Sequence, residues 1–498
     1  MRRFRGLCEQ SSPDGAVMFG GIPSIFALYA AGRDRACLTD LTARMIGVAF
    51  VFYGLIAVGI LAINVPPFQI PDENAHFARA VQIAHGELIA FRFSTLSPDG
   101  GQQVTAGGHI DPALLAVLSR FQGIPFHTDA RAIRAYWTPG IRWSGTQVLQ
   151  GFSNTAIYPP FFYLPSALGV RVGEMVDLTI LQTLTLSRLF MGISAIIVGA
   201  AAIALAGGAA PWLFVILTLP MSLSLIASSS QDSLLLSCSA LAGALFIRAS
   251  RSPDRVPMKE LVGLAIVLSL VAIARPPYLA LALLLIVLTK VSLQARFLAI
   301  VAIATCVAVW SGIVAATSLT NADAFMGADP TGQLEGLKNN PLVLISIAVR
   351  TVITHGREYI VEFVGQLGWL DVTLPPTYHV FARMMLAVGL VAAILGLGGI
   401  HITLTRRLLI AAALLLSVAG VFLSEYLISN VPGNPTVDGV QGRFFLPIAL
   451  GGVIFVSGFA NRRWQPLLYV TLVMMLMAFP IVTIAVVTRA LVLRYYLG

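Results

Sequence analysis

Four polar side chains that could perform acid–base chemistry follow the first strongly apolar segment of the chain. Asp72 and Glu73 are adjacent carboxylates, and His76 and Arg79 follow them at helical spacing. In a helix over residues 72–86, the side chains of Asp72, His76 and Arg79 would lie on one face. An acid, a base and a cation beside a bilayer favour chemistry on an anionic substrate carried by a lipid. The structural alternative is a helix start, in which the two carboxylates complement the helix dipole.

The composition places these residues in a membrane protein. Of the 498 residues, 57% are hydrophobic and only 11% are charged, whereas soluble domains carry about 25% charged residues. The net charge of +9 does not indicate nucleic-acid binding, because the basic residues fall mainly at the ends of apolar segments and in short loops. The four cysteines lie outside the long hydrophilic loops and lack zinc-like spacing, so neither a disulfide framework nor a zinc site is expected.

Eleven apolar segments predict transmembrane helices, within a range of 10 to 13 because several are short for a perpendicular crossing. The predicted spans cover residues 43–63, 184–206, 209–227, 231–248, 259–274, 277–291, 296–318, 380–403, 407–428, 442–459 and 465–488. The segment 157–173 is expected to be re-entrant or interfacial, because counting it as a span would move every later basic loop to the outer side. This topology puts the N-terminus inside and the C-terminus outside, which Arg489 and Arg494 fit poorly.

The fold class that follows is an all-α polytopic membrane protein with a large first outer loop. Residues 1–42 form a cytoplasmic N-terminal segment, and residues 43–318 form an N-terminal transmembrane module whose outer loop, 64–183, contains short interfacial helices. A second outer loop with interfacial helices covers 319–379, and residues 380–498 form the C-terminal transmembrane helices. Because nucleotides are scarce on the outer side, an enzyme there would take activated substrates from lipid carriers.

Further ionisable residues are expected to meet Asp72 at the outer membrane edge. Arg275 and Arg443 are candidates for binding a lipid phosphate, since a guanidinium group matches phosphate oxygens with a planar fork of donors. Asp72 is the first candidate, and Glu73 the second, for the base that deprotonates an acceptor hydroxyl attacking a sugar's anomeric carbon. Candidates for further substrate contacts are His76, Arg79, Tyr158, Asp232, Trp369 and Asp371. Taken singly, such residues are also typical helix-end or interface anchors.

Several of these segments resemble a family of bacterial membrane proteins, DUF2142. The resemblance covers IPDENAHFARAVQIAHGE, YPPFFYLPSALGVRVG, SSSQDS, ARPPY, GQLGWLD and QGRFFLPI, in this order along residues 45–460. That family is similar to the glycosyltransferase C superfamily, whose members take sugars from polyprenyl-phosphate carriers. The resemblance implies a glycosyltransferase-C-like fold, a match of Asp72 and Glu73 to the superfamily's catalytic acidic pair, and a place for Arg443 near the donor phosphate. One departure is a serine, where the family often has alanine, after Asp232.

The function expected on these grounds is that of an integral membrane glycosyltransferase with an inverting mechanism. It would move a sugar from a polyprenyl-phosphate donor to a lipid-linked glycan or cell-surface polysaccharide, at the outer, periplasmic face of the bacterial inner membrane. Its expected partners are this donor, the acceptor and membrane lipids, and no nucleic acid. A divalent cation is optional, and no metal ligands are assigned. The alternatives are a transporter or flippase for lipid-linked sugars, and a polysaccharide polymerase or ligase.

Overall fold

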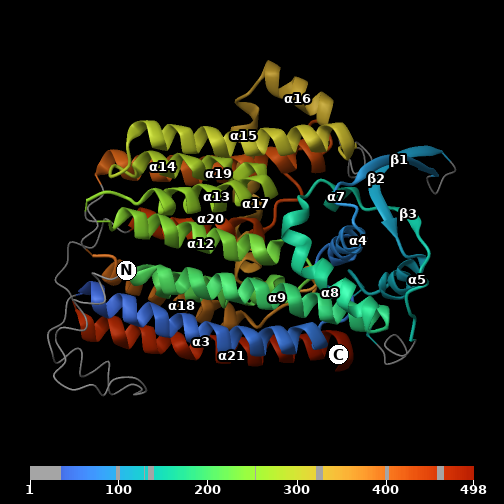
Figure 1. Cartoon of the computed structure of the whole chain (residues 1–498), viewed down its shortest axis with the longest axis horizontal. Helices are drawn as coiled ribbons and strands as arrows, with labels where there is room; N and C mark the ends of the chain where they lie inside the picture. Colours follow the sequence, from blue (N-terminus) through green and yellow to red (C-terminus); the bar gives the residue numbers. More distant parts are fainter. Residues whose placement is uncertain are drawn as a thin grey trace.

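The computed structural model consists mainly of helices that run side by side in one bundle (Figure 1). It describes residues 35–96, 101–127, 129–132, 140–252, 254–320, 329–398, 403–456 and 465–497. The expected N-terminal segment 1–42 therefore lies mostly outside the described residues. The part that is described, from residue 35, already belongs to the first long helix.

Seven helices of the described chain are long and apolar enough to cross a membrane. They are α3 (Arg35–Asn64), α9 (Ile180–Leu205), α12 (Asp232–Ser250), α15 (Leu293–Thr317), α18 (Pro376–Gly396), α19 (Leu404–Ser429) and α21 (Pro466–Val492), which continues into the π-helix η7 (Leu493–Leu497). An eighth candidate is the pair α10 (Ala210–Leu217) and α11 (Pro220–Ile226), which is bent by 82°. The polytopic membrane architecture is thus confirmed, while the count of eleven crossings stays a prediction.

Prolines explain why some predicted spans are short or broken. Pro220 begins α11, where its ring and missing N–H prevent a continuous helix across the predicted span 209–227. Residues 259–274 form α13 (Met258–Ala274), and Pro276 begins η3 (Pro276–Leu283), a 3-10 helix that precedes α14 (Leu284–Val287). Pro447 lies in the first turn after η5 (Gly442–Phe445), within α20 (Leu446–Val456). These shorter elements lie among the long helices of the bundle (Figure 1).

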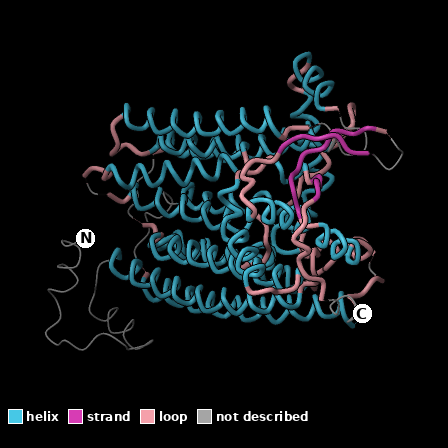
Figure 2. Tube along the Cα trace, turned by 45° about the vertical axis from the view of Figure 1, so that its right-hand side comes forward, coloured by secondary structure: helices cyan, strands magenta, loops and turns pink. Residues whose placement is uncertain are grey.

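The first outer loop contains a small sheet that the sequence analysis did not predict. Strands β1 (Phe91–Leu96), β2 (Gln102–Ile110) and β3 (Val148–Gly151) pair antiparallel in the order β1-β2-β3 (Figure 2). The short helices expected in this loop are present as well, so the strands are an addition to the predicted all-α class. Glycine makes the pairing possible, because a Cβ on Gly107 would lie 1.9 Å from the carbonyl oxygen of Gln150 on β3.

Short helices surround the sheet at the same end of the bundle. They are α4 (Glu73–Ala84), α5 (Pro112–Phe121), α7 (Ser153–Ala156), η1 (Pro160–Tyr163) and α8 (Leu164–Met175). The segment expected to be re-entrant or interfacial corresponds to η1 and α8, and α8 packs against α4 and α9. With twelve residues, α8 is too short to cross a bilayer.

The second outer loop is also helical. It contains α16 (Pro330–Asn339) and α17 (Val343–Gly365), followed by a tight turn closed by a bridge between Leu367 and Val372. One side of α17 exposes Ile345, Val349, Val352, Ile353 and Ile360. The exposed side chains recur at helical spacing, which is typical of a helix in contact with lipid.

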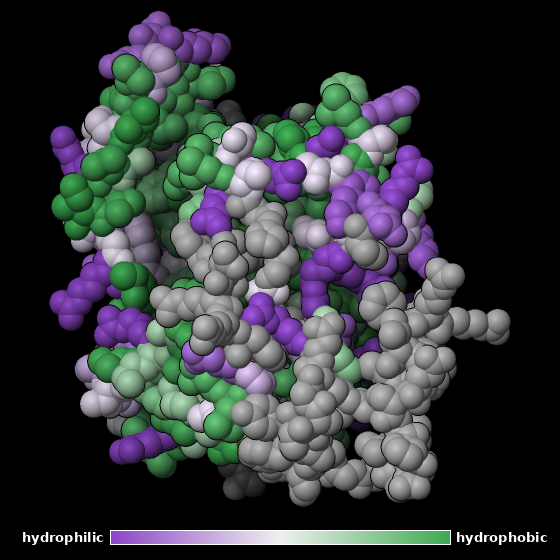
Figure 3. Space-filling model, turned by 90° about the vertical axis from the view of Figure 1, so that its left-hand side faces the viewer, coloured by the Kyte–Doolittle hydropathy of each residue, from purple (hydrophilic) through white to green (hydrophobic). Residues whose placement is uncertain are grey.

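The two ends of the bundle differ in character. The sheet, α4, α5 and the C-terminus lie at one end (Figures 1 and 2). At the other end, Arg251 pairs with Asp40 at 3.0 Å and Arg248 pairs with Glu260 at 3.0 Å. Figure 3 shows hydrophilic side chains among apolar ones at this second end. The C-terminus thus shares the side of the first outer loop, while the orientation of that side relative to the cell stays a prediction.

Candidate functional site

Asp72 precedes α4 in an unusual backbone conformation. Its φ of 60° and ψ of 7° lie in the left-handed region, which a residue with a side chain seldom adopts. Its carboxylate makes no capping hydrogen bond to α4 and instead accepts from Nη2 of Arg443 at 3.2 Å and from Nδ2 of Asn154 at 3.4 Å. The helix considered over 72–86 is present as α4, over residues 73–84, and Asp72 is its N-cap residue, whose side chain does not cap it.

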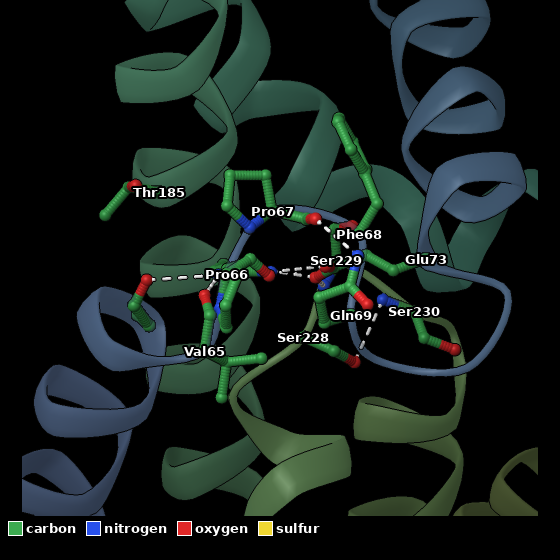
Figure 4. A network of polar contacts seen from close by, with 12 residues as sticks. Val65, Pro66, Pro67, Phe68, Gln69, Glu73, Thr185, Ser228, Ser229 and Ser230 are labelled. Carbon is green, nitrogen blue, oxygen red and sulfur yellow. Dashed lines mark hydrogen bonds and ion pairs between the residues drawn. The ribbon is translucent and has the colours of Figure 1, made fainter. Parts of the chain in front are cut away.

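Glu73 has a different environment although it is the next residue. Its side chain is fully buried, and both carboxylate oxygens accept from Arg188, with Nε at 2.8 Å from Oε1. Arg188 also donates to the carbonyl oxygens of Val65 at 2.8 Å and Pro66 at 3.1 Å, and the backbone N–H of Ser229 donates to Glu73. Figure 4 shows Glu73 near Ser229 and the turn that contains Val65 and Pro66. This pair fixes the turn between α3 and α4.

The neighbouring carboxylates therefore divide into one accessible and one enclosed group. The Asp72 side chain is 37% exposed, whereas the Glu73 side chain is 0% exposed. A base must reach the proton that it removes, so the geometry favours Asp72 for chemistry and Glu73 for holding the backbone.

The two candidate phosphate-binding arginines line one pocket, and Arg443 contacts Asp72. Arg275 donates through Nη2 to both carboxylate oxygens of Asp232, at 3.0 and 3.2 Å. The guanidinium carbons of Arg275 and Arg443 lie 4.3 and 5.5 Å from the centre of the Phe444 ring. One aromatic ring thus contacts two cations, an arrangement stabilised by cation–π attraction and by the acidic partners.

Both arginines line a common pocket near the end of the bundle that carries the sheet. Its lining includes Asp232, Arg275, Tyr278, Arg443 and Phe444. The Tyr278 hydroxyl donates to the Phe444 carbonyl oxygen at 2.8 Å and so links η3 to η5.

The lack of a side chain at Gly442 allows η5, which carries Arg443, to lie close to α17. A Cβ on Gly442 would lie 2.2 Å from the carbonyl oxygen of Tyr359. The backbone N–H of Gly442 donates to Glu362 at 2.6 Å. Any larger residue would push η5 away from α17 and move Arg443.

His76 is buried against two tyrosines. Its Nδ1 atom lies 2.6 Å from the Tyr163 hydroxyl, and its ring stacks on Tyr158 with a centroid separation of 6.0 Å. Burial lowers the pKa of His76 to about 4, because desolvation penalises the charged imidazole. At neutral pH His76 is therefore uncharged and positions Tyr158, which is half-buried.

Arg79 contacts the backbone of the first outer loop. Arg79 is fully buried and donates to the carbonyl oxygens of Leu88 at 2.8 Å and Tyr158 at 3.3 Å. Burial lowers its pKa to about 10, so it remains charged at neutral pH. Asp72, His76 and Arg79 therefore do not present one common functional face, because Arg79 is occupied by backbone carbonyls of the first outer loop.

Trp369 and Asp371 join the second outer loop to other segments. The Trp369 indole donates to the Phe68 carbonyl oxygen at 3.0 Å. Asp371 pairs with Arg494 at 2.6 Å, and Arg494 also donates to the carbonyl oxygens of Ile124 and Ala130. This cluster holds both outer loops against the C-terminal segment, so its contacts are structural. These contacts also account for Arg494, a basic residue that fits poorly with a C-terminus on the outer side.

Two residues of the site were missed by the sequence analysis. Asn154 lies in a segment noted only for its aromatic residues, and Phe444 directly follows Arg443. A third neighbour, Glu425 near the end of α19, interacts electrostatically with Arg275, Arg443 and Asp72. Phe444 could have been found from the sequence, because it is adjacent to Arg443. Asn154 and Glu425 are far from the other site residues in the chain, and only the fold brings them to the site.

A metal ion does not fit the side chains that the structure describes. No group of three His, Cys, Asp or Glu residues in this part of the chain could hold one. The carboxylates of Asp72 and Asp232 are each paired with an arginine.

Fold and site together define a polytopic membrane protein with paired charges in a pocket at one end of its helical bundle. The family profile described as "Predicted membrane protein (DUF2142)" matches residues 55–451. The chain belongs to this family. No curated protein matches the chain significantly, and neither does any solved structure.

Proposed function

We propose that this protein is an inverting membrane glycosyltransferase that uses a polyprenyl-phosphate sugar as donor. The observation that carries the proposal is the position of the accessible Asp72 carboxylate, 3.2 Å from Arg443, which lines one pocket together with Arg275. A base in contact with one of two permanent cations that share a pocket is an arrangement suited to sugar transfer from a lipid phosphate. The acceptor in this proposal is a lipid-linked glycan or a cell-surface polysaccharide on the outer face.

The arginines bind and stabilise the phosphate in this mechanism. The Nε atoms of Arg275 and Arg443 are buried and have no hydrogen-bond partner within the described ranges. Phosphate oxygens are suitable acceptors for such donors. As the bond between the anomeric carbon and the phosphate oxygen breaks, negative charge grows on the phosphate, and fixed cations stabilise that charge more in a buried site than in water.

Asp72 acts on the acceptor. An acceptor hydroxyl attacks the anomeric carbon, its proton passes to the Asp72 carboxylate, and the lipid phosphate leaves with the electron pair of the broken bond. A single displacement of this kind inverts the anomeric configuration. It needs one base, because the phosphate leaves without protonation by a second carboxylic acid, unlike the leaving group of a hydrolase.

The ion pair between Asp72 and Arg443 gives donor binding a second effect. A phosphate that binds Arg443 competes with the single contact to Asp72, whereas Arg275 is held by both oxygens of Asp232. Donor binding would therefore release Asp72 and make its carboxylate available as the base. The proposed order is donor first and acceptor second.

A flippase for lipid-linked sugars is the second candidate, because α10 and α11 form a broken helix. The two segments are bent by 82°, and α11 ends at Ile226, six residues before Asp232. Broken helices beside a binding site are typical of transporters. Movement of a lipid-linked sugar across sealed vesicles without formation of a new glycosidic bond would support this candidate.

A transfer assay on purified protein in nanodiscs tests the leading proposal. The assay uses a panel of radiolabelled polyprenyl-phosphate sugars with a membrane lipid-glycan extract, and it determines the anomeric configuration of the product. Transfer with inversion supports the proposal, and a product ladder instead of single additions would indicate a polymerase. Transfer with retention, or no transfer from any donor of the panel, would contradict it.

Labelling of single cysteines in intact cells tests the proposed orientation. Position 177, in the first outer loop, should react with an impermeant maleimide, because the Asp177 side chain is 79% exposed. Position 259, at the opposite end, should react only after the cells are opened. The reverse pattern would place the pocket on the cytoplasmic side and exclude the outer-face part of the proposal.

A further inference from the structure

An apolar pocket adjoins the charged pocket inside the helical bundle. It lies between α12, α13, η3, α14 and α20, and its lining includes Gly243, Phe246, Leu268 and Gly451. Pro447 lines both pockets. The two pockets are therefore neighbours, one with arginines in its wall and one with an almost entirely apolar wall.

Successive turns of α12 connect the two pockets. Asp232 and Leu236 line the charged pocket, and Ser239, Gly243 and Phe246 line the apolar one. At a rise of about 1.5 Å per residue, Asp232 and Phe246 lie about 21 Å apart along the helix. The track runs away from the end of the bundle that carries the sheet (Figure 1).

We infer that this track binds the hydrocarbon chain of an isoprenoid monophosphate whose phosphate lies at Arg275 and Arg443. The inference rests on the proposed function and names the place of the donor's lipid chain. A molecule with an anionic head and one apolar tail matches a wall that changes from guanidinium groups to aliphatic side chains over a few helical turns. Burial of such a tail is favourable in proportion to the apolar area covered.

The dimensions of the track favour one chain over two. The residues lining the apolar pocket are buried between neighbouring segments of the bundle, as the low exposure of Phe246, Leu264 and Val271 shows. Both pockets are small, and the wall of the apolar pocket contains two small residues, Gly243 and Gly451, at which helices approach. A single flexible chain can enter by displacing side chains, whereas a phospholipid with two acyl chains would have to separate the helices.

Two adjacent glycines of α20 provide a matched pair of variants. Gly451 lines the apolar pocket, and a Cβ there would lie 3.7 Å from Leu414 Cδ2, an ordinary van der Waals distance. A Cβ on Gly452 would meet no heavy atom of the described chain within 4 Å. Gly451→Leu should therefore fill the track, while Gly452→Leu adds the same side chain to the same helix outside it.

Equilibrium binding to the full-length protein in nanodiscs, followed by native mass spectrometry, tests the inference. The probes are undecaprenyl phosphate, citronellyl phosphate with its much shorter chain, and the two-chain lipid phosphatidic acid. Gly451 lies about 12 to 14 Å beyond Arg443 along η5 and α20, so the citronellyl chain should end before the new leucine. Gly451→Leu should weaken binding of undecaprenyl phosphate by roughly tenfold and leave binding of citronellyl phosphate unchanged. Gly452→Leu should alter neither.

The outcomes separate this inference from the proposed function. Equal effects of the two variants, equal losses for both isoprenoid probes, or tight phosphatidic acid binding that Gly451→Leu does not affect would overturn the lipid track. Chain-length-dependent binding in a protein that transfers no sugar would support the track and remove the glycosyltransferase proposal. Sugar transfer from a long-chain donor that Gly451→Leu leaves unchanged would support the glycosyltransferase proposal and remove the lipid track.

Discussion

The carboxylate of Asp72 lies 3.2 Å from Nη2 of Arg443, although 371 positions separate the two residues in the chain. Asp72 belongs to the turn before α4, and Arg443 belongs to η5. The contact joins the first outer loop to the C-terminal helices at the pocket that Arg275 and Asp232 complete. This relationship underlies the proposal that one residue acts as a base and the other binds phosphate.

Replacing Glu73 should damage the fold, because its partner would remain buried without a counter-charge. Removing one member of a buried ion pair costs about 3–5 kcal/mol, and both side chains here are 2% exposed or less. Glu73→Gln should therefore lower the apparent melting temperature strongly, measured by tryptophan fluorescence in detergent. The double variant Glu73→Gln with Arg188→Met should recover part of the loss. A Glu73→Gln protein as stable as the wild type would show that the pair does not anchor the turn.

Replacing Arg443 by lysine should weaken donor binding while retaining the charge. Lysine lacks the planar fork of donors, and hydrogen bonds to charged groups contribute about 1.5–3 kcal/mol. We expect a KM for the donor that is higher by roughly tenfold or more, measured in the transfer assay. Arg171→Lys is the control, since Arg171 is 54% exposed on α8 and pairs with Glu174. Equal KM values for both variants would remove Arg443 from the donor site.

His76 should make stability fall in acid. Its pKa is about 4 in the folded protein and about 6.5 in an unfolded chain. The unfolded state therefore binds the proton first as the pH falls below 6.5, and stability decreases until about pH 4, below which both states are protonated. The loss is on the order of 3 kcal/mol for this pKa difference.

His76→Asn should remove this part of the pH dependence. Melting temperatures between pH 7 and pH 4 measure it, with His127→Asn as the control, because His127 is exposed. If the melting temperature of the His76 variant fell with pH as steeply as that of the wild type, the acid sensitivity would arise from other groups.

The pair of Asp371 and Arg494 should hold the first outer loop against the C-terminal segment. Without its carboxylate partner, Arg494 loses the contact that orients it toward the carbonyl oxygens of Ile124 and Ala130. Asp371→Asn should increase hydrogen exchange in peptides containing these residues, measured by mass spectrometry. Asp177→Asn, at a side chain that is 79% exposed, should leave this exchange unchanged. Unchanged exchange in the Asp371 variant would contradict a joining role.

The sequence predicted which residues meet but not how they pair. Hydrophobic segments and basic loops place Asp72, Asp232, Arg275 and Arg443 at one end of the bundle, and the structure brings these four into one site. Their pairing depends on the relative rotation and depth of helices far apart in sequence, which periodicity does not encode.

Two other features had no local signal. The left-handed conformation of Asp72 separates its side chain from that of Glu73, and helical spacing alone would have treated the two as similar. The sheet forms between strands that are short, and β2 carries two glycines where an alternating pattern of apolar residues would be expected. Both depend on tertiary contacts of the first outer loop.

The most direct test of the account is a comparison of Asp72→Asn with the wild type in two assays, sugar transfer and donor binding. Asparagine keeps the size of the side chain but cannot accept the proton, so transfer should fall by roughly 10² to 10⁴-fold. Donor binding should remain at least as tight as in the wild type, because the phosphate no longer competes with a carboxylate for Arg443. Normal turnover by Asp72→Asn would contradict the central claim that Asp72 is the base.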